Sequence, residues 1–161
     1  MANGLYQTEG IILNRVDVGE ADRILIVFTK EFGMLRLFAR GVRRVRSKLN
    51  NFLNLFSHVR VGFVSGKETW HLIDAEDLRH FGDDKLEALG KAANFLERFC
   101  RGEGKEEKLW EALRDFIKSG NELLFYAKSL AALGYLDEKE IHKNPRDLEK
   151  LISEAIARSQ L

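Results

Sequence analysis

The sequence is poor in cysteine and proline, and it has no long apolar run. Its 161 residues include a single cysteine, Cys100, so neither a disulfide framework nor a cysteine-rich zinc site can form within the chain. The single proline argues against an extended linker. No apolar stretch approaches the roughly 18 residues of a membrane span, and the N-terminal residues lack the basic segment and long apolar segment of a secretory leader. We therefore expect a soluble, cytoplasmic protein without a membrane partner.

Motifs for catalysis are also missing. Neither G-x-x-x-x-G-K-[ST] nor G-x-G-x-x-G occurs, and the four histidines are scattered, without ligand spacing. Cys100 falls on the apolar stripe of a predicted helix, where a thiol behaves as a small inert hydrophobe. The carboxylates of Asp17, Glu20 and Asp22 crowd one turn but match no calcium loop. We expect no enzymatic activity, no metal and no cofactor.

What the sequence does contain is an uneven distribution of charge. The net charge is only +1, yet residues 1–73 hold eleven Lys and Arg against six Asp and Glu, and the remainder holds fifteen against nineteen. The positive charge is densest in FARGVRRVRSKLNNF, Phe38–Phe52. This asymmetry predicts that one end of the chain meets a polyanion while the other end packs or binds protein.

The first half has the pattern of short strands. β-Branched and apolar runs separated by glycine turns predict strands at about residues 9–16, 22–29 and 34–40. Two more strands follow the basic segment, joined by a turn at residues 65–67. Five strands with no helix between the first three favour a β-barrel of the oligonucleotide/oligosaccharide-binding type, the OB-fold. A small sandwich is the competing interpretation.

The second half has the pattern of four amphipathic helices. Apolar residues recur at steps of three and four over residues 84–101, and Gly120 and Gly134 end later helices. Asn121 and Asn144 are predicted N-caps, with Pro145 at the first helical position. The predicted class is α+β with two domains: an OB-fold domain at residues 1–81 and a helical domain at residues 82–161.

The third predicted strand carries the first candidate site. If it is extended, alternate side chains point to one face, and that face holds Arg36, Phe38 and Arg40. Guanidinium groups beside phosphates and a phenyl ring under a base are what single-stranded nucleic acid requires. The alternative is that the helical half covers Phe38 and that the arginines form a solvated edge.

The loop after this strand extends the basic surface. A run of Lys and Arg in a Gly- and Ser-containing loop has no role in a core and is solvated or neutralised by a partner. We expect Gly41 and Ser47 to let the loop bend, and three apolar residues, Val42, Val45 and Leu49, to anchor it to the barrel. The candidate DNA-binding residues are Arg36, Phe38, Arg40, Arg43, Arg44, Arg46 and Lys48.

The ordered motifs resemble the N-terminal domain of the bacterial recombination mediator RecO family. The resemblance rests on EGIIL, GEADRILIVFT, KEFGMLR, ARGVRR followed by SKL, and FSHVRV, which occur in that order over some sixty residues. It implies a protein that binds single-stranded and double-stranded DNA, anneals strands, and helps RecA load onto strands coated by single-stranded DNA-binding protein, usually with RecR.

One feature departs from this family. Many members continue with a four-cysteine zinc module, whereas no cysteine follows Cys100 here. We therefore interpret the chain as a compact member that lacks the zinc-binding cysteines. Two other functions remain open on the residues: a protein-interaction adaptor whose basic loop binds an acidic tail, and an RNA-binding OB-fold protein.

Overall fold

The computed structural model describes residues 4–100 and 102–160, which form two compact units. The first unit is residues 1–106 and the second is residues 107–161. The domain boundary predicted near residues 81–83 stays a prediction. Among the described helices, none combines the length and apolar composition that crossing a bilayer requires.

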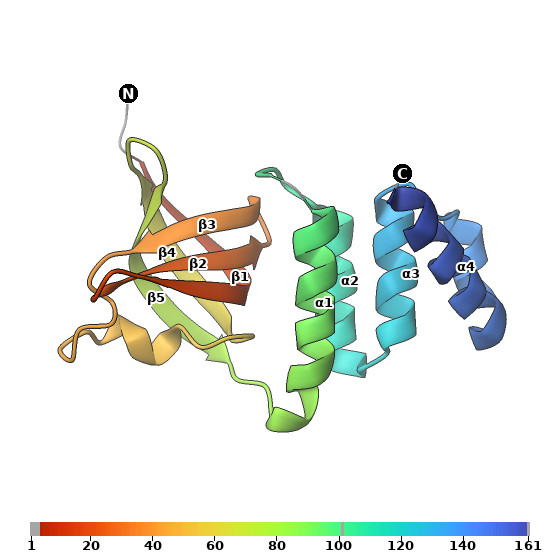
Figure 1. The fold of residues 1–161 in the computed structure, drawn as a ribbon, viewed down its shortest axis with the longest axis horizontal. Helices are drawn as coiled ribbons and strands as arrows, with labels where there is room; N and C mark the ends of the chain where they lie inside the picture. Colours follow the sequence, from red (N-terminus) through yellow and green to blue (C-terminus); the bar gives the residue numbers. More distant parts are fainter. Residues whose placement is uncertain (1–3, 101, 161) are drawn as a thin grey trace. The chain divides into compact units, whose positions relative to one another are not determined.

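Five strands close into a barrel in the first unit (Figure 1). They are paired in the order β1-β2-β3-β5-β4, all antiparallel except β3 with β5. Their bounds are β1 (Leu5–Val18), β2 (Asp22–Thr29), β3 (Gly33–Ala39), β4 (His58–Ser65) and β5 (Trp70–Arg79). The predicted OB-fold barrel is confirmed, and the sandwich interpretation is wrong.

β1 is longer at both ends than its predicted range of residues 9–16. Its first residues pair with β4, where Leu5 lies opposite Val64 and Thr8 lies opposite Val61. These partners are distant in sequence, so no local pattern indicates that β1 extends beyond its predicted range. The hairpin turn predicted at residues 65–67 is present, with the amide of Gly66 donating to the carbonyl of Thr69 over 2.8 Å.

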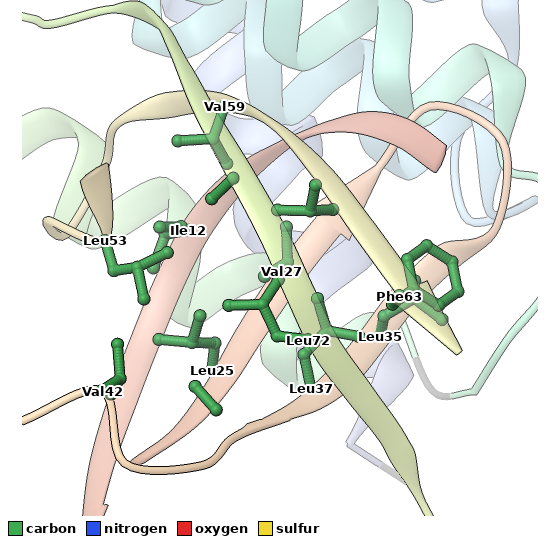
Figure 2. Close-up of a cluster of buried hydrophobic side chains, with 13 residues drawn as sticks. Ile12, Leu25, Val27, Leu35, Leu37, Val42, Leu53, Val59, Phe63 and Leu72 are labelled. Atoms are coloured by element: carbon green, nitrogen blue, oxygen red, sulfur yellow. The ribbon is translucent and has the colours of Figure 1, made fainter. Parts of the chain in front are cut away.

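The barrel interior is a continuous apolar core (Figure 2). Alternate residues of each strand point inward, as the two-residue period of a strand requires. The long connection between β3 and β4 also contributes, because Val42 and Leu53 are buried in the same cluster. The members are Ile12, Leu25, Val27, Leu35, Leu37, Ala39, Val42, Leu53, Val59, Val61, Phe63, Leu72 and Ala75.

Helices follow the barrel in the order predicted. α1 (Leu86–Phe99) belongs to the first unit, is preceded by the 3₁₀ turn η2 (Asp83–Lys85), and contacts β1. The second unit packs α3 against α2, α4 and the 3₁₀ turn η3. The bounds are α2 (Glu107–Ser119), α3 (Glu122–Ala132), η3 (Glu138–His142) and α4 (Pro145–Ser159).

Both predicted N-caps are confirmed. The side-chain oxygen of Asn121 accepts from the amide of Leu124 over 3.1 Å, and that of Asn144 accepts from the amide of Asp147 over 3.0 Å. These bonds satisfy amides that the first helical turn leaves without a partner. Local sequence alone therefore specified where α3 and α4 begin.

Two turn glycines provide a matched test of barrel stability. Gly19 and Gly33 both have positive φ, 58° and 69°, but a Cβ at Gly19 meets open space, whereas one at Gly33 overlaps the carbonyl of Gly104. Gly19→Ala should lose about 1 kcal/mol of unfolding free energy from backbone strain, and Gly33→Ala clearly more. Urea unfolding followed by circular dichroism measures the difference; equal losses would contradict the close approach of Gly104.

Candidate nucleic-acid interface

The outer face of β3 carries the predicted alternation of cations and an aromatic ring. Leu35, Leu37 and Ala39 are at most 2% exposed inside the barrel, so the intervening side chains point outward. Arg36 and Arg40 are exposed and Phe38 is half-buried. Ile26 and Ile24 of β2 lie opposite Arg36 and Phe38, which places an apolar strip beside the charged one.

A groove of about 680 Å³ runs along this face. One wall is the outer surface of β2 and β3, including Arg36 and Phe38, and the other is the β4–β5 turn with Lys67. The ring of Phe38 meets the imidazole of His71 edge to face, with centroids 5.6 Å apart. The complete lining is Ile24, Met34, Arg36, Phe38, Ser65, Gly66, Lys67, Glu68, Thr69, Trp70, Gly102 and Glu103.

Trp70 is fixed at one end of this groove by an aromatic cluster. Its ring lies 5.3 Å from that of Phe63 and 5.4 Å from that of Tyr6, both edge to face. Phe32 completes the cluster, 5.4 Å from Phe63. Phe63 belongs to the barrel core and Phe32 and Trp70 pack against it, so the indole rests on the core while its N–H reaches a partner at the groove.

The basic loop after β3 is tied to the β1–β2 turn by carboxylates. Asp17 accepts from Arg23 over 2.7 Å and lies 3.4 Å from Arg43, whose guanidinium also donates to the carbonyl of Gly19. Asp22 accepts from the amide of Gly41 over 2.6 Å. The hydrogen bond from Arg23 holds the pKa of Asp17 below its ordinary value. This end of the loop is therefore held in place.

The prediction that three apolar residues anchor the loop was wrong for one of them. Val42 is 1% exposed within the core, and Leu49 packs against the same cluster. Val45, by contrast, is completely exposed at 104%. It lies in the part of the loop beyond the contacts of Arg43, and its exposure shows that no described residue covers its side chain. The loop is thus anchored at its two ends and projects between them.

The candidate cations fall into two groups. Arg43 has protein partners and helps to shape the loop. Within residues 4–100 and 102–160, no carboxylate lies within the 4.0 Å of an ion pair from the other five candidates. These five, which we call the unpaired cations, are Arg36, Arg40, Arg44, Arg46 and Lys48. Their charge is available to a polyanion.

Two of the carboxylates considered above as metal ligands contact protein groups, and the thiol considered as a nucleophile lies in the core. In the described part of the chain, no three His, Cys, Asp or Glu side chains are grouped so as to hold a metal ion. Asp17 and Asp22, considered above as metal ligands, have protein donors instead. Burial raises the pKa of the Cys100 thiol to about 11, so the thiol is protonated at neutral pH, as expected for an inert core residue.

Sequence reasoning missed the far wall of the groove. Lys67 and Trp70 belong to the β4–β5 hairpin, and β5 meets β3 through the short parallel pairing of Leu37 with Trp70 and of Phe38 with His71. Parallel partners have no local sequence signal, since they are joined by a long connection. The cation and the aromatic residue close together in GKETW were the only available hint.

A closed five-stranded barrel with this strand order defines an OB-fold domain, a class whose β2–β3 face and neighbouring loops are the usual binding surface. A family model described as Recombination protein O N terminal matches residues 1–81, half of the chain. The chain belongs to the RecO family. The membership suggested by the ordered motifs is confirmed.

Individual relatives carry the same family name. The DNA repair protein RecO of Thermobifida fusca is 38% identical over 78 residues, which are 48% of this chain and 32% of that protein. The DNA repair protein RecO of Rubrobacter xylanophilus is 35% identical over 103 residues, 61% of this chain and 42% of that protein. That of Thermodesulfovibrio yellowstonii is 28% identical over 147 residues, 83% and 59% respectively. The chain thus matches only a third to three fifths of these relatives.

The contacts of Asp17 with Arg23 and Arg43 predict how the basic loop responds to substitution of Asp17 and to low pH. Asp17→Asn should speed hydrogen exchange at the Arg43 amide, which donates to the carbonyl of Ala21 over 2.9 Å. Folding lowers the pKa of Asp17, so its ionised carboxylate stabilises the loop at any pH above the pKa of the unfolded chain. This stabilisation is lost as the pH falls through the pKa of the folded state. The wild-type loop should therefore loosen only below about pH 4.

Glu20→Gln is the matched control, because Glu20 is an exposed carboxylate in the same turn. It should leave exchange at Arg43 unchanged. Equal effects of the two substitutions would show that Asp17 does not hold the loop.

Proposed function

We propose that the chain is a non-enzymatic, DNA-binding recombination mediator that acts in DNA repair. It binds single-stranded and double-stranded DNA, promotes annealing of complementary strands and helps RecA load. The observation that carries the proposal is the set of unpaired cations on β3 and its loop, beside a groove with an aromatic ring. Membership in the RecO family and the name DNA repair protein on its relatives support it.

The chemistry of the face suits backbone binding without base recognition. Cations that neutralise phosphates release counterions and bind any sequence, and Phe38 offers a stacking platform that every base can use. Annealing requires the same property, because repulsion between two strands falls when cations lie between them. The candidate residues on β3 position one DNA strand, and the projecting loop with Arg44 and Arg46 can contact a second DNA strand.

The partners follow from the family and are part of this proposal. RecR, RecA and single-stranded DNA-binding protein are the proteins with which we expect the chain to act. The surface that would bind them is not assigned to particular residues of either unit.

The salt dependence of binding tests the unpaired cations. Five phosphate contacts to a single strand give a slope of about −3.5 for log K against log salt, taking about −0.7 per contact. The triple variant Arg44→Ala, Arg46→Ala, Lys48→Ala should weaken binding and make the slope shallower by about 2. Fluorescence anisotropy of a labelled oligonucleotide over a salt series measures both quantities.

The control removes the same charge from the second unit. Lys118→Ala, Arg146→Ala, Lys150→Ala replaces three exposed cations on α2 and α4 and should leave the slope unchanged. A triple loop variant with wild-type affinity and slope would refute this assignment of the site.

Phe38 is tested separately for stacking. Phe38→Leu keeps an apolar side chain of similar size but removes the ring, and stacking contributes roughly 1 to 3 kcal/mol per base. Single-strand affinity should fall at least about fivefold, with an unchanged salt slope because no phosphate contact is lost. Unchanged affinity would remove Phe38 from the interface.

Competition between DNA, RNA and an acidic peptide distinguishes the proposed function from the two alternatives, an adaptor and an RNA-binding protein. An adaptor would bind an acidic peptide and show negligible affinity for oligonucleotides at physiological salt, and an RNA-binding protein would prefer RNA over DNA of the same sequence. The proposal expects DNA to displace the acidic peptide, and DNA affinity at least equal to that for RNA.

A further inference from the structure

An acidic segment forms part of the groove lining. Gly102–Glu106, which we call the acidic strap, follows α1 and lies along the β2–β3 turn. Glu103 forms a β-bridge with Gly33, and the amide of Gly104 donates to the carbonyl of Phe32 over 2.9 Å. Lys105 lies 4.0 Å from Glu31. Backbone and side-chain contacts therefore hold the strap against the barrel.

Glu103 brings a negative charge into the groove itself. Its carboxylate accepts from the indole N–H of Trp70 over 2.8 Å, and both residues belong to the groove lining. The same groove holds Arg36 and Lys67. An anionic oxygen hydrogen-bonded to a donor among cations is what a bound phosphate would present. Glu103 thus occupies a position that suits an oxygen of the ligand.

The attachment of the strap is exposed and bordered by two glycines. Glu103 lies between Gly102 and Gly104, with φ of 101° and 145°, conformations that L side chains rarely adopt. Glu103, Gly104 and Lys105 are all exposed to solvent, where a hydrogen bond contributes little because water competes for both partners. A few weak contacts between glycines can open without disturbing the barrel core.

We propose that the acidic strap is an autoinhibitory element: Glu103 acts as an internal mimic of a phosphate, and nucleic acid displaces it from Trp70 and the groove. The inference rests on the proposed function, since it assigns a regulator to the same site. A phosphate entering the groove meets the like charge of Glu103 and competes for the indole donor. Binding therefore requires the strap to leave.

Charge-neutralising substitutions test the strap. Glu103→Gln removes the like charge, and Glu103→Ala also removes the acceptor for Trp70. Glu106→Gln is the matched control, because Glu106 is an exposed carboxylate of the same segment that does not line the groove. At about 0.1 M salt, both Glu103 variants should bind a single-stranded oligonucleotide about fivefold more tightly than the wild type, the factor for removing one like charge at about 4 Å in water. Glu106→Gln should change affinity less than about twofold.

Hydrogen exchange gives a second measurement that does not depend on a variant. The Gly104 amide is bonded to Phe32 in the closed strap. Oligonucleotide binding to the wild type should speed its exchange while slowing exchange at β3 and the β4–β5 turn. Slower or unchanged exchange at Gly104 with a protected groove would overturn the strap proposal.

The outcomes separate the two proposals. Oligonucleotide binding by the wild type with equal effects of the Glu103 and Glu106 substitutions overturns the strap alone. Absence of binding by the wild type and by both Glu103 variants at low salt overturns the proposed function, and the strap with it. Binding by the Glu103 variants that exceeds wild-type binding supports both.

Discussion

The structure depends on the exclusion of charge from the interior of a closed barrel. A strand in such a barrel has one face inside, and that face must be apolar because an unpaired guanidinium cannot be buried. Leu35, Leu37 and Ala39 fill the interior, so Arg36 and Phe38 are placed on the outside. The same constraint that packs the core thus builds the candidate binding face.

The first half of the chain has few carboxylates, and their positions divide its arginines into two kinds. Asp17 and Asp22 are used at the root of the basic loop, where Asp17 pairs with Arg23 and Arg43. Beyond this root, no carboxylate of the described residues pairs with the loop, so the charge of Arg44 and Arg46 remains available. Outside this half of the chain, Glu103 lies in the groove and accepts from the indole of Trp70. The surface is therefore basic along the loop, and in our proposal it is regulated by Glu103 in the groove.

Sequence patterns predicted the features that depend on neighbouring residues. Strand alternation identified the outer face of β3, and side-chain capping identified the starts of α3 and α4 at Asn121 and Asn144. Features that depend on distant partners were missed: the extension of β1 along β4, Trp70 beside β3, and Glu103 against Gly33. These contacts exist only after the barrel closes. For the same reason Val45 was wrongly placed, because an apolar residue in a loop does not reveal whether any surface lies near it.

We propose that the unpaired arginines of β3 and its loop contact DNA, whereas the arginines paired with Asp17, which we call tied arginines, do not. NMR of arginine Nε–Hε groups during titration with a single-stranded oligonucleotide tests it directly. We expect large shifts for Arg36, Arg44 and Arg46 and small shifts for Arg23, which donates to Asp17 and Asn50. Shifts confined to residues 107–161, or equal shifts for tied and unpaired arginines, would contradict it.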